Sequence, residues 1–156
     1  GASFDSRFGG FGYNALNPNR PKFPEPSNLF FLLDYLQQSS DATEEARDQA
    51  SKFLVKTCEG MLKGGIYDHL GGGFHRYSVD RFWHIPHFEK MLYDNALILG
   101  TLAEAYQITK KPIYQDVIHA TFTSSTPDKN IIVVKTVFLR VCIFGFLCYN
   151  LFFFCD

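Results

Sequence analysis

Four of the five histidines in this chain fall between residues 64 and 95, in a segment that also holds carboxylates, arginine and the only tryptophan. These histidines are His69, His75, His84 and His87. A loop that merely joins two helices rarely carries so many groups able to move protons or bind polar ligands. The segment therefore predicts a binding or catalytic site.

Proton transfer is the chemistry that these side chains suit best. Imidazole titrates near neutral pH, so His75 and His87 are the candidates for acid and base. Asp68 and Glu89 are the carboxylates expected to orient the histidines, to share their protons, or to act themselves as acid, base or nucleophile. Contacts with a ligand are expected from His69, Arg76, Tyr77, Trp83, Lys90 and Asp94.

Structural interpretations of the same residues remain open. Asp68 and Asp94 suit the caps of turns and helix ends, and Glu89 suits the first turn of a helix or a local ion pair. Tyr77 and Trp83 suit core packing.

A metal site is another chemistry that these residue types could supply. His84, His87 and Glu89 have the composition of a two-histidine, one-carboxylate site. A proline between the two histidines argues against their lying on one helical face, so no metal is predicted. The glycines at 71–73 are not followed by the Gly-Lys-Ser/Thr of a phosphate-binding loop, so they indicate a tight turn. No cofactor is predicted.

Length and charge indicate one ordinary domain without a nucleic-acid partner. The chain has 156 residues and a formal net charge of -1, and it has no run of Lys and Arg. Three of its four cysteines follow Asn130, so Cys58 stands alone in the better-patterned region and suits a buried helix position. A reducing compartment, cytoplasmic or mitochondrial, is favoured because no disulfide framework is evident.

An internal repeat organises the chain. Phe-Asp, three residues and Gly-Gly-Phe at residues 4–11 return as Tyr-Asp, three residues and Gly-Gly-Phe at residues 67–74, an offset of 63. A helix pair is predicted after each copy. In the first pair, one helix starts at Ser27 and the other near Asp41, with a turn at about residues 39–41 between them, and the second helix ends at Gly64-Gly65. In the second pair, one helix spans about His87 to Thr109 and the other starts at Pro112.

This order predicts an all-α fold, a partial α/α toroid with its long loops on one functional face. About two of six hairpins are expected over residues 1–123, a fragment of the toroid domain. Residues 124–156 are expected to be an aberrant apolar tail, produced by a frame break or a retained intron. A tail anchor is the alternative, although the apolar run from Val141 to Cys155 is shorter than the roughly 20 residues that span a bilayer.

Four segments resemble one family. These are GGFG at residues 9–12, PKFPEPSNL at 21–29, GGIYDHLGGGFHRYSVD at 64–80 and WHIPHFEKMLYDNA at 83–96. Together they resemble the spermatogenesis-associated, thioredoxin-domain-containing proteins and their bacterial relatives. The resemblance implies a toroid similar to N-acylglucosamine 2-epimerases and six-hairpin glycosidases, preceded by a thioredoxin-like domain that this chain does not contain. The insertion at residues 13–20 departs from the family pattern.

The resemblance implies that the parent toroid acts on or binds a small sugar, by epimerase-like or glycosidase-like acid/base chemistry. The chain alone is expected to be inactive, because two hairpins do not enclose a pocket. The alternative is a non-catalytic scaffold that binds a protein partner, with a role in fertility or spermatogenesis. A membrane contact is expected only if the tail is genuine.

Overall fold

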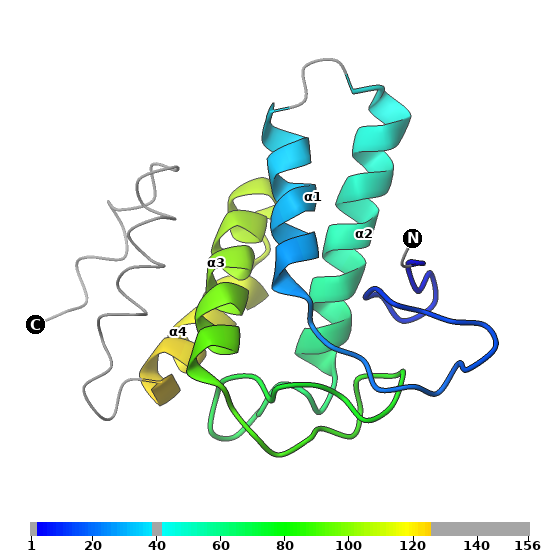
Figure 1. Ribbon diagram of the computed structural model, residues 1–156. Coiled ribbons are helices and arrows are strands. Elements are labelled where there is room, and N and C mark those ends of the chain that lie inside the picture. The colour runs from blue at the N-terminus through cyan, green and yellow to red at the C-terminus, as the bar shows by residue number, and fades with distance from the viewer. Residues whose placement is uncertain (1–2, 39–41, 126–156) are drawn as a thin grey trace, which may run out of the picture.

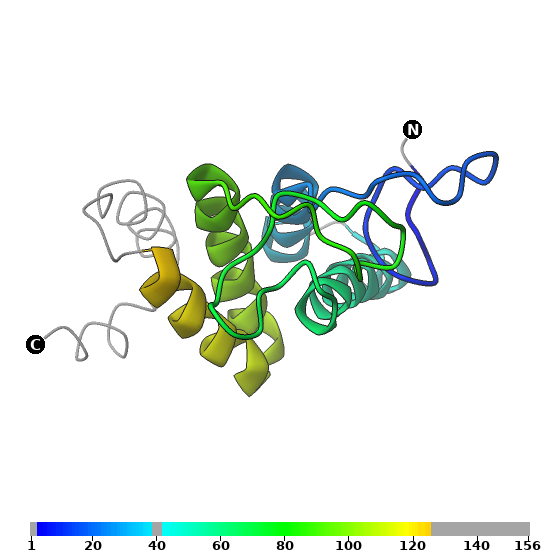
Figure 2. The same cartoon turned by 90° about the horizontal axis from the view of Figure 1, so that it is seen from below.

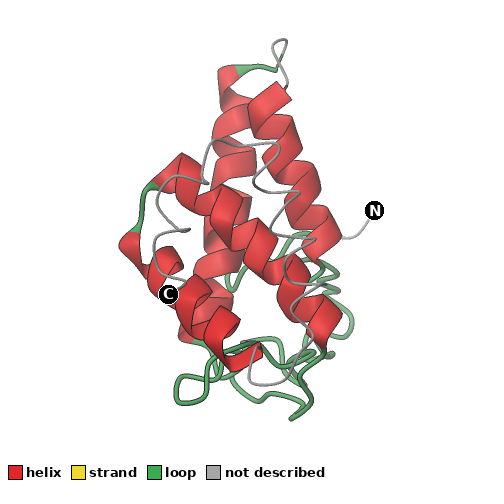
Figure 3. Ribbon diagram, turned by 90° about the vertical axis from the view of Figure 1, so that its left-hand side faces the viewer, coloured by secondary structure: helices red, strands yellow, loops and turns green. Residues whose placement is uncertain are grey.

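Four helices form the computed structural model over the residues that it describes, 3–38 and 42–125. They are α1 (Pro26–Gln38), α2 (Glu44–Lys63), α3 (Leu92–Thr109) and α4 (Pro112–Ser125). Within these ranges there is no strand, and loops and isolated bridges make up the rest (Figure 3). The predicted all-α class is confirmed, whereas closure into a toroid stays a prediction.

The helices form two hairpins that share one interface. Helix α1 packs against α2, α3 packs against α4, and α1 and α3 join the two pairs. The long loops, residues 3–25 and 64–91, gather at one end of the helices, and the α3–α4 turn lies at the other (Figure 1). Seen from the end that carries the long loops, the second loop runs across the helix ends from α2 to α3 (Figure 2). The predicted turn at residues 39–41 lies outside the described residues.

Apolar side chains from all four helices and from the second loop make one core. The sequence spacing predicts one apolar stripe on α1, made of Leu29, Leu32, Leu33 and Leu36. The stripe faces the core, since three of these leucines are buried and Leu32 is partly buried against them. Helix α3 is buried on several faces, with nine buried residues against six in α2 and three in α1, as expected for a helix that is apolar most of the way round. Its fully or nearly fully buried large side chains are Ile98, Leu99 and Leu102.

Helix α2 begins and ends at residues with clear physical roles. The Thr43 hydroxyl accepts the N–H of Ala46, 3.3 Å away, so Thr43 is the N-cap. Asp41, near which the sequence predicts the start of this helix, lies outside the described residues. Gly64 ends the helix as predicted, with an extended φ of -86°. A Cβ on Gly64 would lie 2.4 Å from the carbonyl oxygen of Trp83, so close packing requires glycine here.

Helix α3 begins at Leu92, five residues after the His87 start that the sequence predicted. Residues 85–89 instead form backbone hydrogen bonds with residues 76–79. In one of these bonds the N–H of Arg76 donates to the carbonyl of Glu89 at 2.7 Å. The spacing of Phe88, Leu92 and Ala96 predicts that Phe88 points inward from such a helix, yet Phe88 is 83% exposed. Glu89 therefore does not lie in the first turn of a helix.

Cys58 matches its predicted role as a buried helix residue. It is free and has no exposed surface, and burial raises the pKa of its thiol to about 12. The thiolate needed for redox or nucleophilic chemistry is thus absent at neutral pH.

The predicted apolar tail lies, from residue 126 onward, outside the described residues. No helix in the described part of the chain is both long and apolar enough to cross a membrane.

Candidate functional site

Two turns, residues 5–10 and 68–73, have the same backbone geometry. In each, the N–H of the aspartate donates to the carbonyl of the last glycine at 2.9 Å, and its carboxylate accepts the N–H groups two and three residues later at 2.8 to 3.1 Å. Both final glycines of each turn have positive φ, between 71° and 86°. Side-chain-bearing residues rarely adopt this conformation, which explains the Gly-Gly pair in both copies. The repeat in the sequence is therefore a repeat in the structure.

A lysine closes each turn. Lys90 Nζ lies 2.7 Å from the carboxylate of Asp68 and 2.7 Å from the carbonyl of Gly72. Lys22 bonds its own turn in the same way, at 2.8 Å to Asp5 and 2.7 Å to the carbonyl four residues after that aspartate. The N–H of Gly71 and the ammonium of Lys90 hold the pKa of Asp68 well below its usual range. Asp68 therefore stays ionised at neutral pH and serves the turn.

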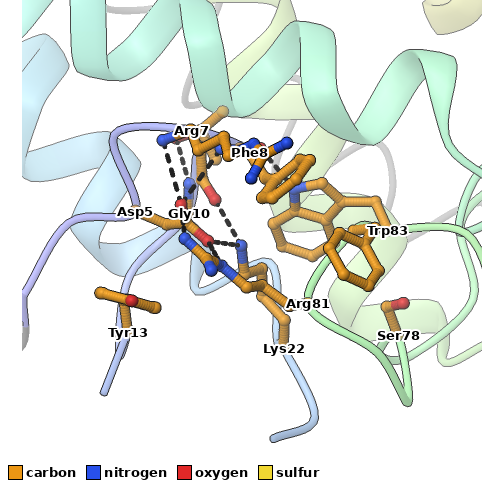
Figure 4. Close-up of polar contacts among 12 residues, drawn as sticks. Asp5, Arg7, Phe8, Gly10, Tyr13, Lys22, Ser78, Arg81 and Trp83 are labelled. Carbon is orange, nitrogen blue, oxygen red and sulfur yellow. Dashed lines mark hydrogen bonds and ion pairs between the residues drawn. The ribbon is translucent and has the colours of Figure 1, made fainter. Parts of the chain in front are cut away.

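The first turn also binds a cation from the second loop. Asp5 has no exposed surface, and the Arg81 guanidinium reaches it with Nε at 2.7 Å and Nη2 at 2.9 Å (Figure 4). Burial opposes ionisation of Asp5, yet the bonds from Arg81 and Lys22 hold its pKa well below the usual range. Sequence reasoning missed this cluster, although the 63-residue offset aligns Asp5 with Asp68 and was the signal that pointed to it.

Three extended segments lie side by side and support the candidate site. Lys22 and Ser78 exchange backbone hydrogen bonds of 2.8 and 2.9 Å, and the N–H of His87 donates to the carbonyl of Tyr77 at 2.9 Å. Side chains on neighbouring extended segments meet across such pairs. The rings of Phe23, Tyr77 and His87 accordingly stack in sequence, each step 4.7 Å between centroids.

Polar side chains converge beside these stacked rings. Glu89 Oε2 lies 3.3 Å from Arg76 Nη1 and 3.7 Å from His87 Nδ1. Burial raises the pKa of Asp94, which also feels the opposing charges of Arg76 and Glu89. We call Arg76, His87, Glu89 and Asp94 the rim cluster. It brings together four of the residues that the sequence predicted.

His75 lies beneath an exposed aromatic ring. It is 8% exposed, its Nδ1 meets no hydrogen-bond partner among the described residues, and the Phe88 ring stands edge-on at 5.3 Å. Burial, and then the charge of Lys90, lowers the pKa of His75. The imidazole is therefore neutral at pH 7 and able to accept a proton.

Two predicted ligand contacts have other roles. Trp83 has no exposed surface, and its Nε1–H donates to the carbonyl of Phe8 at 2.9 Å. A ring buried in this way offers no face on which a ligand could stack. His69 Nε2 lies 3.0 Å from the carbonyl of Gly64, at the end of α2. Trp83 thus ties the second loop to the first loop, and His69 ties the second loop to the end of α2.

Known proteins match most of this chain at high identity. An uncharacterized protein of Caenorhabditis elegans is 48% identical over 110 residues, which is 70% of this chain and 14% of that protein. Human spermatogenesis-associated protein 20 is 42% identical over 114 residues, 73% of this chain and 14% of its own length, and the mouse protein is 44% identical over 114 residues. The chain belongs to the spermatogenesis-associated protein 20 family.

Family membership confirms the resemblance drawn from the sequence motifs. The match spans 13 to 14% of the length of these relatives, so the activity of a whole family member is a separate question. No family model matches the chain.

The described residues contain no group of side chains placed to bind a metal ion. Among residues 3–38 and 42–125, no three histidine, cysteine, aspartate or glutamate side chains are grouped so that they could hold a metal ion. What the rim cluster offers is a carboxylate set between a guanidinium and an imidazole.

Proposed function

We propose that the rim cluster binds a sugar and exchanges a proton with it in a full-length member of the family. The observation that carries this proposal is the position of Glu89, whose carboxylate lies within 4 Å of both Arg76 and His87. A carboxylate beside an imidazole orients the ring and stabilises its protonated form, which is the arrangement of a general acid/base pair.

Two further groups would complete the chemistry. Asp94 has a raised pKa and His75 a lowered one, so the first is biased toward a proton donor and the second toward an acceptor. Environments that push titratable groups apart in this way are typical of acid/base sites. Removal and return of a proton on a sugar would be an epimerase reaction, and protonation of a leaving oxygen would be a glycosidase reaction.

The exposed ends of the ring stack suit a sugar as ligand. Phe23 and His87 are about half exposed, at 44% for the residue and 46% for the side chain respectively, while Tyr77 lies between them. Arg76 adds a planar donor for a hydroxyl or carboxylate.

Substituting His87→Ala in a full-length family member that carries these residues tests the proposal. Removing a general acid or base lowers turnover by roughly 10²- to 10⁴-fold. The readouts are deuterium uptake from heavy water into N-acylated amino sugars, followed by NMR, and release of nitrophenol from aryl glycosides. His84→Ala is the matched control, because His84 is exposed in the same loop and lies outside the rim cluster.

Retained circular dichroism with lost turnover supports the enzyme. Unchanged turnover in both His87→Ala and Glu89→Gln, with the fold retained, contradicts it.

Exposed apolar residues on the same loops favour a protein-binding scaffold as the second candidate. Leu70, Ile85 and Phe88 are 101%, 58% and 83% exposed. Exposed apolar patches often mark protein contacts. If the toroid is a scaffold, Phe88→Ser and Ile85→Ser would abolish capture of a partner from testis extract, the tissue that the relatives' name suggests, whereas the parent protein would turn over no sugar.

A thioredoxin-like domain ahead of the toroid remains a prediction from the resemblance.

A further inference from the structure

A cleft of about 270 Å³ opens between helix α2 and the loop segments at residues 7–8 and 82–84. No member of the rim cluster lines it. Its floor includes Gly60, where a Cβ would lie 2.7 Å from the carbonyl oxygen of Phe8 and 3.1 Å from the Trp83 ring. The helix and the loop therefore approach closely at the floor, and the cleft opens outward from there.

Positive charge gathers on the walls of this cleft. Lys56 and Lys63, which lie two turns apart on α2, share the wall with Arg7 from the first loop. Within the described residues, neither Arg7 nor Lys56 has an ion-pair partner. Cations that share one cleft repel each other, and a bound anion would relieve that repulsion.

The carboxylate in the lining is already neutralised. Glu59 accepts from Lys111 and, at 3.2 Å, from Lys63. These bonds, that from Lys111 first, lower the pKa of Glu59, so it stays ionised and bound to its two lysines. The cleft thus presents an excess of positive charge to a ligand.

Two phenylalanines add an apolar wall. Phe8 and Phe82 pack edge to face with ring centroids 4.8 Å apart, and Phe82 is 38% exposed. A ligand with a flat or apolar part would gain contact area here in addition to its charge.

We propose that this cleft binds a small organic phosphate monoester. The phosphate would lie among Arg7, Lys56 and Lys63, and the organic part would pack on Phe82. A phosphate monoester carries about -1.5 to -2 charges at pH 7, which matches several cations better than a single carboxylate does. The fork of Arg7 suits phosphate oxygens in pairs.

Calorimetric titration of the full chain with phenyl phosphate, inorganic phosphate and phenol at constant ionic strength tests the proposal. Phenyl phosphate should bind more tightly than inorganic phosphate, and phenol should show no heat of binding. Lys56→Gln should weaken phenyl phosphate about tenfold through loss of a charge-assisted bond. The matched control is Lys52→Gln, one turn earlier on α2, because Lys52 pairs with Asp48 and does not line the cleft.

Affinity unchanged in Lys52→Gln and reduced in Lys56→Gln and Lys63→Gln, with unchanged circular dichroism, supports the cleft. Equal weakening by Lys52→Gln and Lys56→Gln would show general attraction to a charged helix and overturn the proposal. Absence of binding, or phenyl phosphate no tighter than inorganic phosphate, overturns it as well.

Discussion

Asp5 holds the first turn through bonds that reach three parts of the chain. It accepts two backbone N–H groups of its own turn, the ammonium of Lys22 and the guanidinium of Arg81. The side chains of Asp5 and Lys22 are 0% and 4% exposed. Ionic groups buried to this extent tolerate loss of a partner poorly, because the remaining charge has no water to solvate it.

We expect Asp5→Asn to lower the free energy of unfolding by about 3–5 kcal/mol, since it leaves two cations without their carboxylate. Urea denaturation followed by circular dichroism measures the change. Asp48→Asn is the matched control, because Asp48 and its partner Lys52 are 58% and 72% exposed, and about 0.5 kcal/mol or less is expected. Equal losses in the two variants would contradict a structural role for the buried cluster.

Asp5→Asn should also change how the free energy of unfolding falls at acid pH. The pKa of Asp5 is lowered from 3.8, so its contribution is present above that pH and is lost as the pH falls through the lowered value. The Asp5→Asn variant should accordingly lose less stability below pH 4 than the parent chain.

At the scale of elements, the first loop is held directly against the backbone of helix α2. The N–H of Gly10 donates to the Thr57 hydroxyl at 2.9 Å. A Cβ on Gly9 would lie 2.7 Å from the carbonyl oxygen of Lys56 and 2.8 Å from the Cα of Thr57. Backbone atoms cannot move aside as a flexible side chain does, so this contact sets how the loop lies on the helix.

Comparing Gly9→Ala with Gly12→Ala separates the energetic cost of backbone strain from the cost of steric overlap with α2. Both glycines have positive φ, 72° and 75°, which costs a side-chain-bearing residue roughly 1–2 kcal/mol. A Cβ on Gly12 meets nothing nearer than a Glu25 side-chain oxygen at 3.7 Å. We therefore expect Gly12→Ala to lose about 1 kcal/mol and Gly9→Ala about 2 kcal/mol more, from overlap with α2.

Urea denaturation of both glycine variants measures the difference. Similar losses in Gly9→Ala and Gly12→Ala would show that the loop does not need its close approach to the helix.

At the scale of the whole molecule, one core joins both hairpins and the loops. The buried cluster runs from Leu29 on α1 to Ile118 on α4 and includes Trp83 from the second loop. A continuous core of this kind favours a single cooperative unfolding transition. The tryptophan then reports on loop packing, while circular dichroism reports on the helices.

Tryptophan fluorescence and circular dichroism should show the same unfolding midpoint, and Leu102→Ala should shift both together. Leu102 has no exposed surface, so its truncation should cost about 2–5 kcal/mol. Leu97→Ala on the same helix is the control, with a smaller cost expected because Leu97 is 38% exposed. Separate midpoints for the two signals would indicate that the loops unfold independently of the helices.

The sequence by itself determined the helix pairs, their short and long connections, and the repeated turn. These features depend on neighbours in the chain: apolar spacing marks a buried helix face, and Gly-Gly supplies the positive φ that the turn needs. The motifs of the second loop were also enough to identify the family, because they are contiguous.

Tertiary structure alone decided what the loop side chains do. The partners of Asp5 lie 17 and 76 residues away, and the segment after His84 pairs with residues 76–79 and so delays α3 to Leu92. The same packing buries Trp83 and leaves Phe88 exposed. Long-range pairing and burial depend on how the elements pack together, and local spacing does not encode that arrangement.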